Sequence, residues 1–104
     1  MKTPWGESQH VKKIAPGIFF VDTPVHGGYR VWKFMLNKMP EHLKLSDGWY
    51  EEDCEWCKVV IAFPGLFTGY LVTIANDTYN RWFNKYGHYK SNEVIKHEQP
   101  LGTM

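Results

Sequence analysis

Two runs of β-branched and aromatic residues in the first third of the chain constrain its fold most strongly. Residues 18–21, Ile-Phe-Phe-Val, have the strongest strand composition in the sequence, and residues 29–32 alternate like a returning strand. Residues 22–28, which join them, are too many for a two-residue hairpin turn and predict a structured loop. Residues 11–14 precede the turn signal Ala15-Pro16-Gly17 and are a candidate third strand.

The middle of the chain predicts a first main helix over residues 49–63. Asp47 follows a turn residue and can cap this helix, and the acids at 51–53 suit the positive end of a helix dipole. Pro64-Gly65 would end the helix after Phe63. A short helix over residues 33–39, stopped by Pro40, precedes it.

Aromatic residues at helical spacing predict a second main helix. The stripe stands at i, i+3, i+4 and i+7 before a capping Gly87 and consists of Tyr79, Trp82, Phe83 and Tyr86. One long helix over about residues 68–86 is favoured, and a shorter one from Asn76 or Asp77 is the alternative. Such a stripe could stack nucleic-acid bases, but this spacing is more typical of a core.

These patterns predict an α+β fold. A small antiparallel sheet of two or three strands, from the N-terminal third, would pack against the two main helices. Residues 1–104 suffice for a single domain, with residues 88–104 as a loose C-terminal tail because they are polar and weakly patterned.

Projection of the helix over residues 49–63 separates its side chains into two faces. The apolar stripe would hold Tyr50, Cys54, Cys57 and Ile61. The opposite, solvated face would hold Glu51, Glu55, Lys58 and Ala62, with Glu55 and Lys58 paired at i,i+3. Asp53 would lie at the edge of the apolar stripe, where a carboxylate without a partner is costly.

Cys54 and Cys57 are the only cysteines, and their C-x-x-C spacing could indicate half of a zinc site or a redox pair. Zinc would need two further ligands from His26, His42 or His88, and the neighbouring acids would raise the pKa of both thiols. Since both thiols fall on the apolar stripe, we interpret them as core residues and expect no metal and no cofactor.

His26 is followed by Gly27 and Gly28, which would let a ligand or another chain approach the backbone closely. Alternatively, the glycines form a turn with positive φ and His26 simply bonds a carboxylate. If the strands pack on the first main helix, His26 could meet Asp53 or Glu52. Such a pair supplies the minimal parts for acid–base catalysis, or else a structural network.

The bulk composition excludes several classes of function. A net charge of +1 gives no basic face, so direct nucleic-acid binding is not expected. The chain has no nucleophile motif, phosphate-binding glycine loop or carboxylate metal cluster, which favours a non-enzymatic role. The start has no apolar signal core and no apolar run could span a bilayer, so we expect a complete, cytoplasmic, non-membrane protein.

Three motifs in order resemble a family of domains of unknown function. They are Thr3-Pro4-Trp5-Gly6, then Thr23-Pro24-x-His26-Gly27-Gly28, then Trp49-Tyr50-Glu51-Glu52-Asp53-Cys54-Glu55-Trp56. The resemblance covers roughly residues 3–86. Members of that family occur in proteobacterial, plasmid and phage proteins, so the resemblance implies a mobile-element setting and carries over no catalytic residue.

The functional hypothesis is therefore a small phage or mobile-element accessory protein that binds a host protein or complex. Its most concrete form is an inhibitor of a host defence system, such as a CRISPR effector complex. The expected contact surface consists of His26, Gly27, Gly28, Trp49, Glu51, Glu52 and Glu55. The alternative is a small enzyme or nucleotide-binding protein that uses His26 with Asp53 or Glu52.

Overall fold

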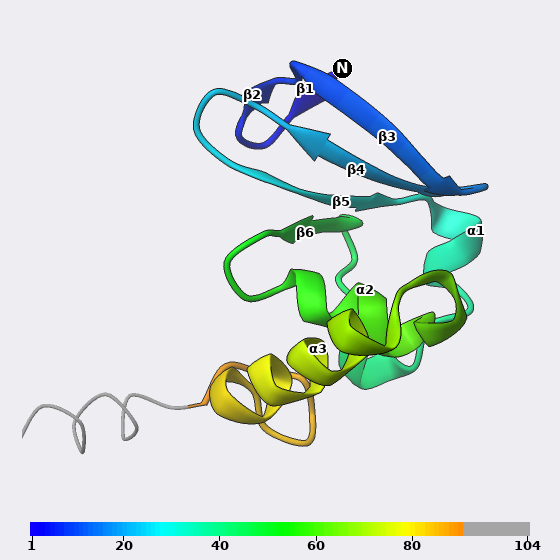
Figure 1. Cartoon of the computed structure of the whole chain (residues 1–104), viewed down its shortest axis with the longest axis vertical. Helices are drawn as coiled ribbons and strands as arrows, with labels where there is room; N and C mark the ends of the chain where they lie inside the picture. The colour runs from blue at the N-terminus through cyan, green and yellow to red at the C-terminus, as the bar shows by residue number, and fades with distance from the viewer. Residues whose placement is uncertain (91–104) are drawn as a thin grey trace, which may run out of the picture.

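The computed structural model describes residues 1–90. Its main feature is an antiparallel sheet with the helices packed on one of its faces (Figure 1). Within these residues the main sheet has four strands in the order β3 (His10–Ala15), β4 (Ile18–Asp22), β5 (Gly27–Val31) and β6 (Trp49–Glu51). A separate two-stranded ribbon consists of β1 (Lys2–Thr3) and β2 (Gly6–Glu7). The helical elements are α1 (Lys33–Leu36), η1 (Glu41–Leu43), α2 (Trp56–Ala62), η2 (Pro64–Leu66) and α3 (Gly69–Trp82).

The two faces of the main sheet have different environments because side chains alternate along each strand. The face toward the helices buries Ile18, Tyr29, Val31 and Tyr50 in one apolar cluster. On the opposite face, strand pairing aligns Phe19 with Arg30 and Arg30 with Trp49. The turn of the β1–β2 ribbon places the ring of Trp5 against that of Trp49, with centroids 5.6 Å apart.

The expected sheet of two or three strands is corrected to four, because residues 49–51 form a strand and not the start of a helix. Tyr50 pairs with Tyr29 of β5, and the fully buried hydroxyl of Tyr50 donates to the Leu43 carbonyl at 2.8 Å. These contacts with distant residues outweigh the local preference of acids for a helix start. Asp47 consequently caps no helix, and its Oδ1 accepts a hydrogen bond from the Trp49 N–H at 3.0 Å within a turn.

The second main helix begins as predicted and ends early. The Thr68 hydroxyl accepts a hydrogen bond from the Leu71 N–H at 3.2 Å and caps α3. The helix stops after Trp82, four residues before Tyr86, because Phe83 turns into a β-bridge with Tyr89. The predicted core stripe is therefore only partly correct: Phe83 is buried and Tyr79 is half-buried, while Trp82 and Tyr86 are exposed.

The first main helix shrinks to α2, and the face expected to meet water is covered. The Nζ of Lys58, whose side chain is 3 % exposed, donates to the Gly87 carbonyl at 2.8 Å and lies 4.2 Å from the centroid of the Phe83 ring. The expected i,i+3 pair with Glu55 is confirmed at 3.0 Å, although it is buried. The prediction that this face is exposed to solvent is wrong, because the chain that follows α3 returns across it.

The expected tail over residues 88–104 falls partly within the described residues. Tyr89 forms the bridge with Phe83, and the Lys90 N–H donates to the Trp82 carbonyl at 2.8 Å. Residues 91–104 lie outside the described residues. Among residues 1–90, no helix combines the length and apolar character needed to cross a membrane.

Strand β3 forms one edge of the main sheet. Its residues 10–13 are exposed and include Lys12 and Lys13, and its pairing with β4 shifts register between Lys13 and Ala15. This edge therefore combines positive charge with an irregular hydrogen-bonding pattern.

Candidate functional site

The loop that carries His26 is held in place by the buried residue Thr23. The Thr23 hydroxyl accepts hydrogen bonds from the N–H groups of Val25 at 3.2 Å and His26 at 3.0 Å, and donates to the His26 carbonyl at 2.7 Å. The Thr23 N–H also donates to that carbonyl at 2.8 Å. Residues 23–26 are therefore fixed by their own hydrogen bonds, and the His26 imidazole, directly before the start of β5, remains half-exposed.

Gly27 and Gly28 are required by close packing, whereas the alternative of a positive-φ turn is wrong. Both lie inside β5, and neither has a positive φ. A Cβ on Gly27 would come within 2.9 Å of the Val21 carbonyl oxygen. A Cβ on Gly28 would overlap the Tyr50 carbonyl oxygen and come within 2.7 Å of the Trp5 ring. The space beside these two glycines is therefore filled by residues of the same chain, and not by a ligand or another chain.

His26 meets the end of β6, where two carboxylates gather around it. The His26 Nδ1 lies 3.3 Å from the Glu51 Oε2, and one ligand atom each from His26, Glu51 and Glu52 lies within 4.8 Å of the others. The second oxygen of Glu51 accepts a hydrogen bond from the Asp53 N–H at 2.9 Å, and the Glu52 N–H donates to the Gly27 carbonyl at 2.9 Å. We call these three side chains the His26 cluster.

The remaining predicted site residues, the catalytic candidate Asp53 and the contact residues Trp49 and Glu55, lie outside the His26 cluster. Asp53, expected at the edge of the core, is exposed because residues 52–55 form turns and not helix, and it lies outside the His26 cluster. Trp49 is half-buried beneath the guanidinium of Arg30, whose Cζ is 4.9 Å from its ring centroid. Glu55 is drawn inward by Lys58 and does not join the cluster.

The cysteines lie apart from the His26 cluster. Cys57 is fully buried, and burial raises the pKa of its thiol to about 12. Cys54 is half-buried, and burial followed by the charge of Asp53 raises the pKa of its thiol. Neither thiol belongs to a cluster of potential metal ligands in residues 1–90. The core interpretation is confirmed for Cys57 and holds in part for Cys54.

An apolar groove lies at the opposite end of the fold from the predicted motifs and was missed from the sequence. It has a volume of about 560 Å³ and is lined by Ala15, Pro16, Phe34, Met35, Lys38, Phe63, Gly65 and Leu66. These residues come from the end of β3 and the turn after it, from α1 and the residues that follow it, and from the connection between α2 and α3. Their separation along the chain leaves no local pattern that would predict a groove.

A family model described as "Domain of unknown function (DUF7007)" matches residues 1–101. The chain belongs to this family. The prediction of a domain of unknown function is therefore confirmed, while the three motifs as its signature and the proteobacterial, plasmid and phage setting remain predictions. No curated protein and no solved structure matches this DUF7007 chain.

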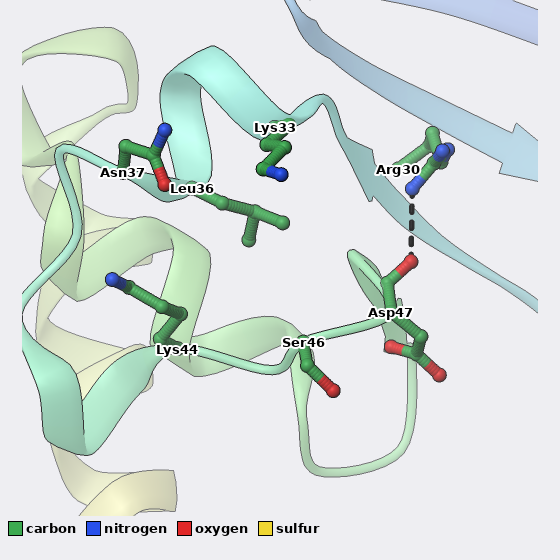
Figure 2. A pocket seen from close by; sticks show the side chains of 7 residues that line it. All are labelled: Arg30, Lys33, Leu36, Asn37, Lys44, Ser46 and Asp47. Carbon is green, nitrogen blue, oxygen red and sulfur yellow. Dashed lines mark hydrogen bonds between the residues drawn. The ribbon is translucent and has the colours of Figure 1, made fainter.

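This DUF7007 domain also has a basic hollow of about 410 Å³ between α1 and the segment that precedes β6 (Figure 2). Its lining residues are Arg30, Lys33, Leu36, Asn37, Lys44, Ser46 and Asp47. Two of its cations already have partners, since Arg30 donates to the Asp47 carbonyl at 2.9 Å and Lys44 lies 3.7 Å from Glu41. The polar groups that line the hollow therefore mainly connect two elements of the fold, and we do not interpret the hollow as a ligand site.

Proposed function

We propose that this protein acts by binding a partner protein, and that the apolar groove is its main contact. The observation that carries the proposal is the exposure of large apolar side chains beside a mostly apolar hollow. Phe34 is 48 % exposed and Leu66 is 42 % exposed, and Trp32 packs against Phe34 with ring centroids 6.2 Å apart. Contiguous apolar surface of this kind typically marks protein-interaction sites, and aromatic anchors dominate binding energies.

The charge around the groove indicates the chemistry of its occupant. Lys38 is the charged residue among those that line it, and no described acidic residue lines it. A partner segment that combines apolar side chains with a carboxylate would be complementary to this surface. Two acids of the contact surface predicted from the sequence, Glu51 and Glu52, lie elsewhere in the His26 cluster, and the third, Glu55, pairs with Lys58.

The identity of the partner follows the hypothesis drawn from the sequence. We propose that the partner is a host protein or protein complex. In its most concrete form, the proposal is that binding inhibits a host defence system such as a CRISPR effector complex. This part of the proposal rests on the resemblance to mobile-element proteins and on the exposed aromatic surface.

A matched pair of substitutions tests the proposal. Leu66→Asp places a charge in the groove, whereas Tyr70→Asp introduces the same carboxylate at an apolar side chain that is 78 % exposed and outside the groove. We expect the tagged full chain to retain a stoichiometric partner from host lysate. Leu66→Asp should weaken binding to the purified partner at least about 10-fold, the loss of a contact worth about 1.4 kcal/mol, with little change for Tyr70→Asp.

The outcome that contradicts the proposal is equally specific. Equal retention by both variants, confirmed as folded by thermal melting, would exclude the groove as the contact. Recovery of no stoichiometric partner would argue against a binding function altogether.

A second candidate function, a small enzyme or nucleotide-binding protein, is favoured by the contact between His26 and Glu51. A histidine beside a carboxylate can transfer protons, and Glu51 takes the place expected for Asp53. Nucleotide turnover by the purified protein that is lost in His26→Ala and retained in His10→Ala would support this candidate. Absence of turnover in the parent protein would exclude it for the nucleotides tested.

A further inference from the structure

The His26 cluster has an unsatisfied acceptor at its centre. The Oε2 of Glu51 is buried, and no hydrogen bond reaches it from any group in residues 1–90. The His26 Nδ1, 3.3 Å away, contacts this oxygen without the geometry of a hydrogen bond. A buried carboxylate oxygen without a donor is costly, so its retention calls for a compensating group.

The spacing of the cluster fits a shared cation. Nitrogen and oxygen ligands lie about 2.1 Å from a tetrahedral zinc ion, which places two ligands about 3.4 Å apart. The observed separation between the His26 Nδ1 and the Glu51 Oε2 is 3.3 Å. The exposed side chain of Glu52 completes the set, since one ligand atom from each of the three residues lies within 4.8 Å of the others.

The backbone around the cluster is organised in advance for ligation. Thr23 fixes the His26 loop, and the pairing of Gly28 with Glu51 fixes the end of β6. Glu52 can lie beside the strand because Gly27 has no Cβ, which would stand 3.1 Å from the Glu52 Oε1. Glu51 lies on β6, His26 directly precedes β5 and Glu52 directly follows β6, so the backbone that carries all three ligands is held by the sheet or by the bonds of Thr23.

We propose that His26, Glu51 and Glu52 bind a divalent transition-metal ion of the zinc type. One imidazole and two carboxylates supply a net charge of −2, which balances the charge of the ion, and the imidazole selects zinc-like ions over magnesium and calcium. Three protein ligands leave one tetrahedral position for water or for an anionic ligand. This site lies apart from the apolar groove and does not depend on the proposed partner.

The test is titration of the metal-free full chain with Zn²⁺ by calorimetry, and with Co²⁺ by its visible absorption. We expect one ion per chain, and a loss of affinity of at least about 10-fold in His26→Ala and in Glu52→Gln. That lower limit is the loss measured when even an outer contact of a metal ligand is removed.

Two control variants separate this site from other ligands. His10 contacts a single carboxylate, that of Asp22, at 3.0 Å on the exposed edge strand, so His10→Ala should leave binding unchanged. Cys54→Ser removes the accessible thiol and should also have no effect. Unchanged binding in folded His26→Ala and Glu52→Gln variants would overturn the proposal. So would an equal loss in His10→Ala, or a loss confined to Cys54→Ser.

Discussion

Replacement of Lys58 by methionine should destabilise the protein more than any surface substitution of the same kind. Methionine keeps the apolar stem against Phe83 and removes the ammonium group. The Glu55 carboxylate, 16 % exposed, and the Gly87 carbonyl would then lose their cationic partner. Removal of one member of a buried ion pair costs about 3–5 kcal/mol, and the residual exposure of Glu55 places Lys58→Met near the lower end, at about 3 kcal/mol.

Urea unfolding at neutral pH measures this loss. With a denaturant dependence of about 1–3 kcal/mol per molar urea, a loss of about 3 kcal/mol lowers the midpoint by about 1–3 M. The matched control is Lys44→Met. Lys44 pairs with Glu41 at the same i,i+3 spacing, but its partner is 92 % exposed, so the expected effect is at most about 1 kcal/mol.

A double-mutant cycle decides whether the charge is responsible. Lys58→Met combined with Glu55→Gln leaves no buried carboxylate without a partner, and should be more stable than the sum of the two single changes predicts. A loss for Lys58→Met no larger than that for Lys44→Met would refute the assignment of Lys58 as a buried anchor. Strict additivity in the cycle would refute the role of Glu55.

Two further predictions concern the centre of the fold. Gly28→Ala should destabilise the protein by about 1–3 kcal/mol, because the added Cβ overlaps the Tyr50 carbonyl and the Trp5 ring. The control Gly65→Ala adds a Cβ in open space and should leave the midpoint of thermal unfolding nearly unchanged. Equal midpoints for the two variants would contradict the close packing at β5. Because burial raises the pKa of Cys57 from 9.0 to about 12, its contribution to stability is complete below pH 9 and should be lost as the pH rises toward 12. Urea midpoints measured at several pH values should fall over this range, and less steeply in Cys57→Ala; identical slopes would contradict the shift.

Local patterns were sufficient for the elements whose partners are close in sequence. The strands β4 and β5 follow from their composition, and the start of α3 was predicted at about residue 68. Residues 49–51 were misread because acids in the next positions resemble a helix start. Only the pairing of Tyr50 with Tyr29, 21 positions earlier in the chain, settles their conformation, and no local pattern contains that information.

The residues of the candidate site could be recognised from the sequence, but the carboxylate that contacts His26 could not. The motif around His26 and the acids after Trp49 were recognisable, but the choice of Glu51 over Asp53 depends on which residues lie in β6. Lys58 shows the same limit. Helical projection placed it on the solvated face, yet the chain after α3 returns to cover that face, and Lys58 is buried against the Gly87 carbonyl.

The exposed edge strand β3 has a consequence for the behaviour of the protein at high concentration. An unpaired edge is a template on which a second chain can add a strand, and charged side chains and irregular pairing both oppose such addition. With Lys12 and Lys13 on β3 and a register shift before Ala15, each copy repels the corresponding edge of another. Pairing of this edge with the edge of another copy is therefore disfavoured, even though the protein exposes large aromatic side chains elsewhere on its surface.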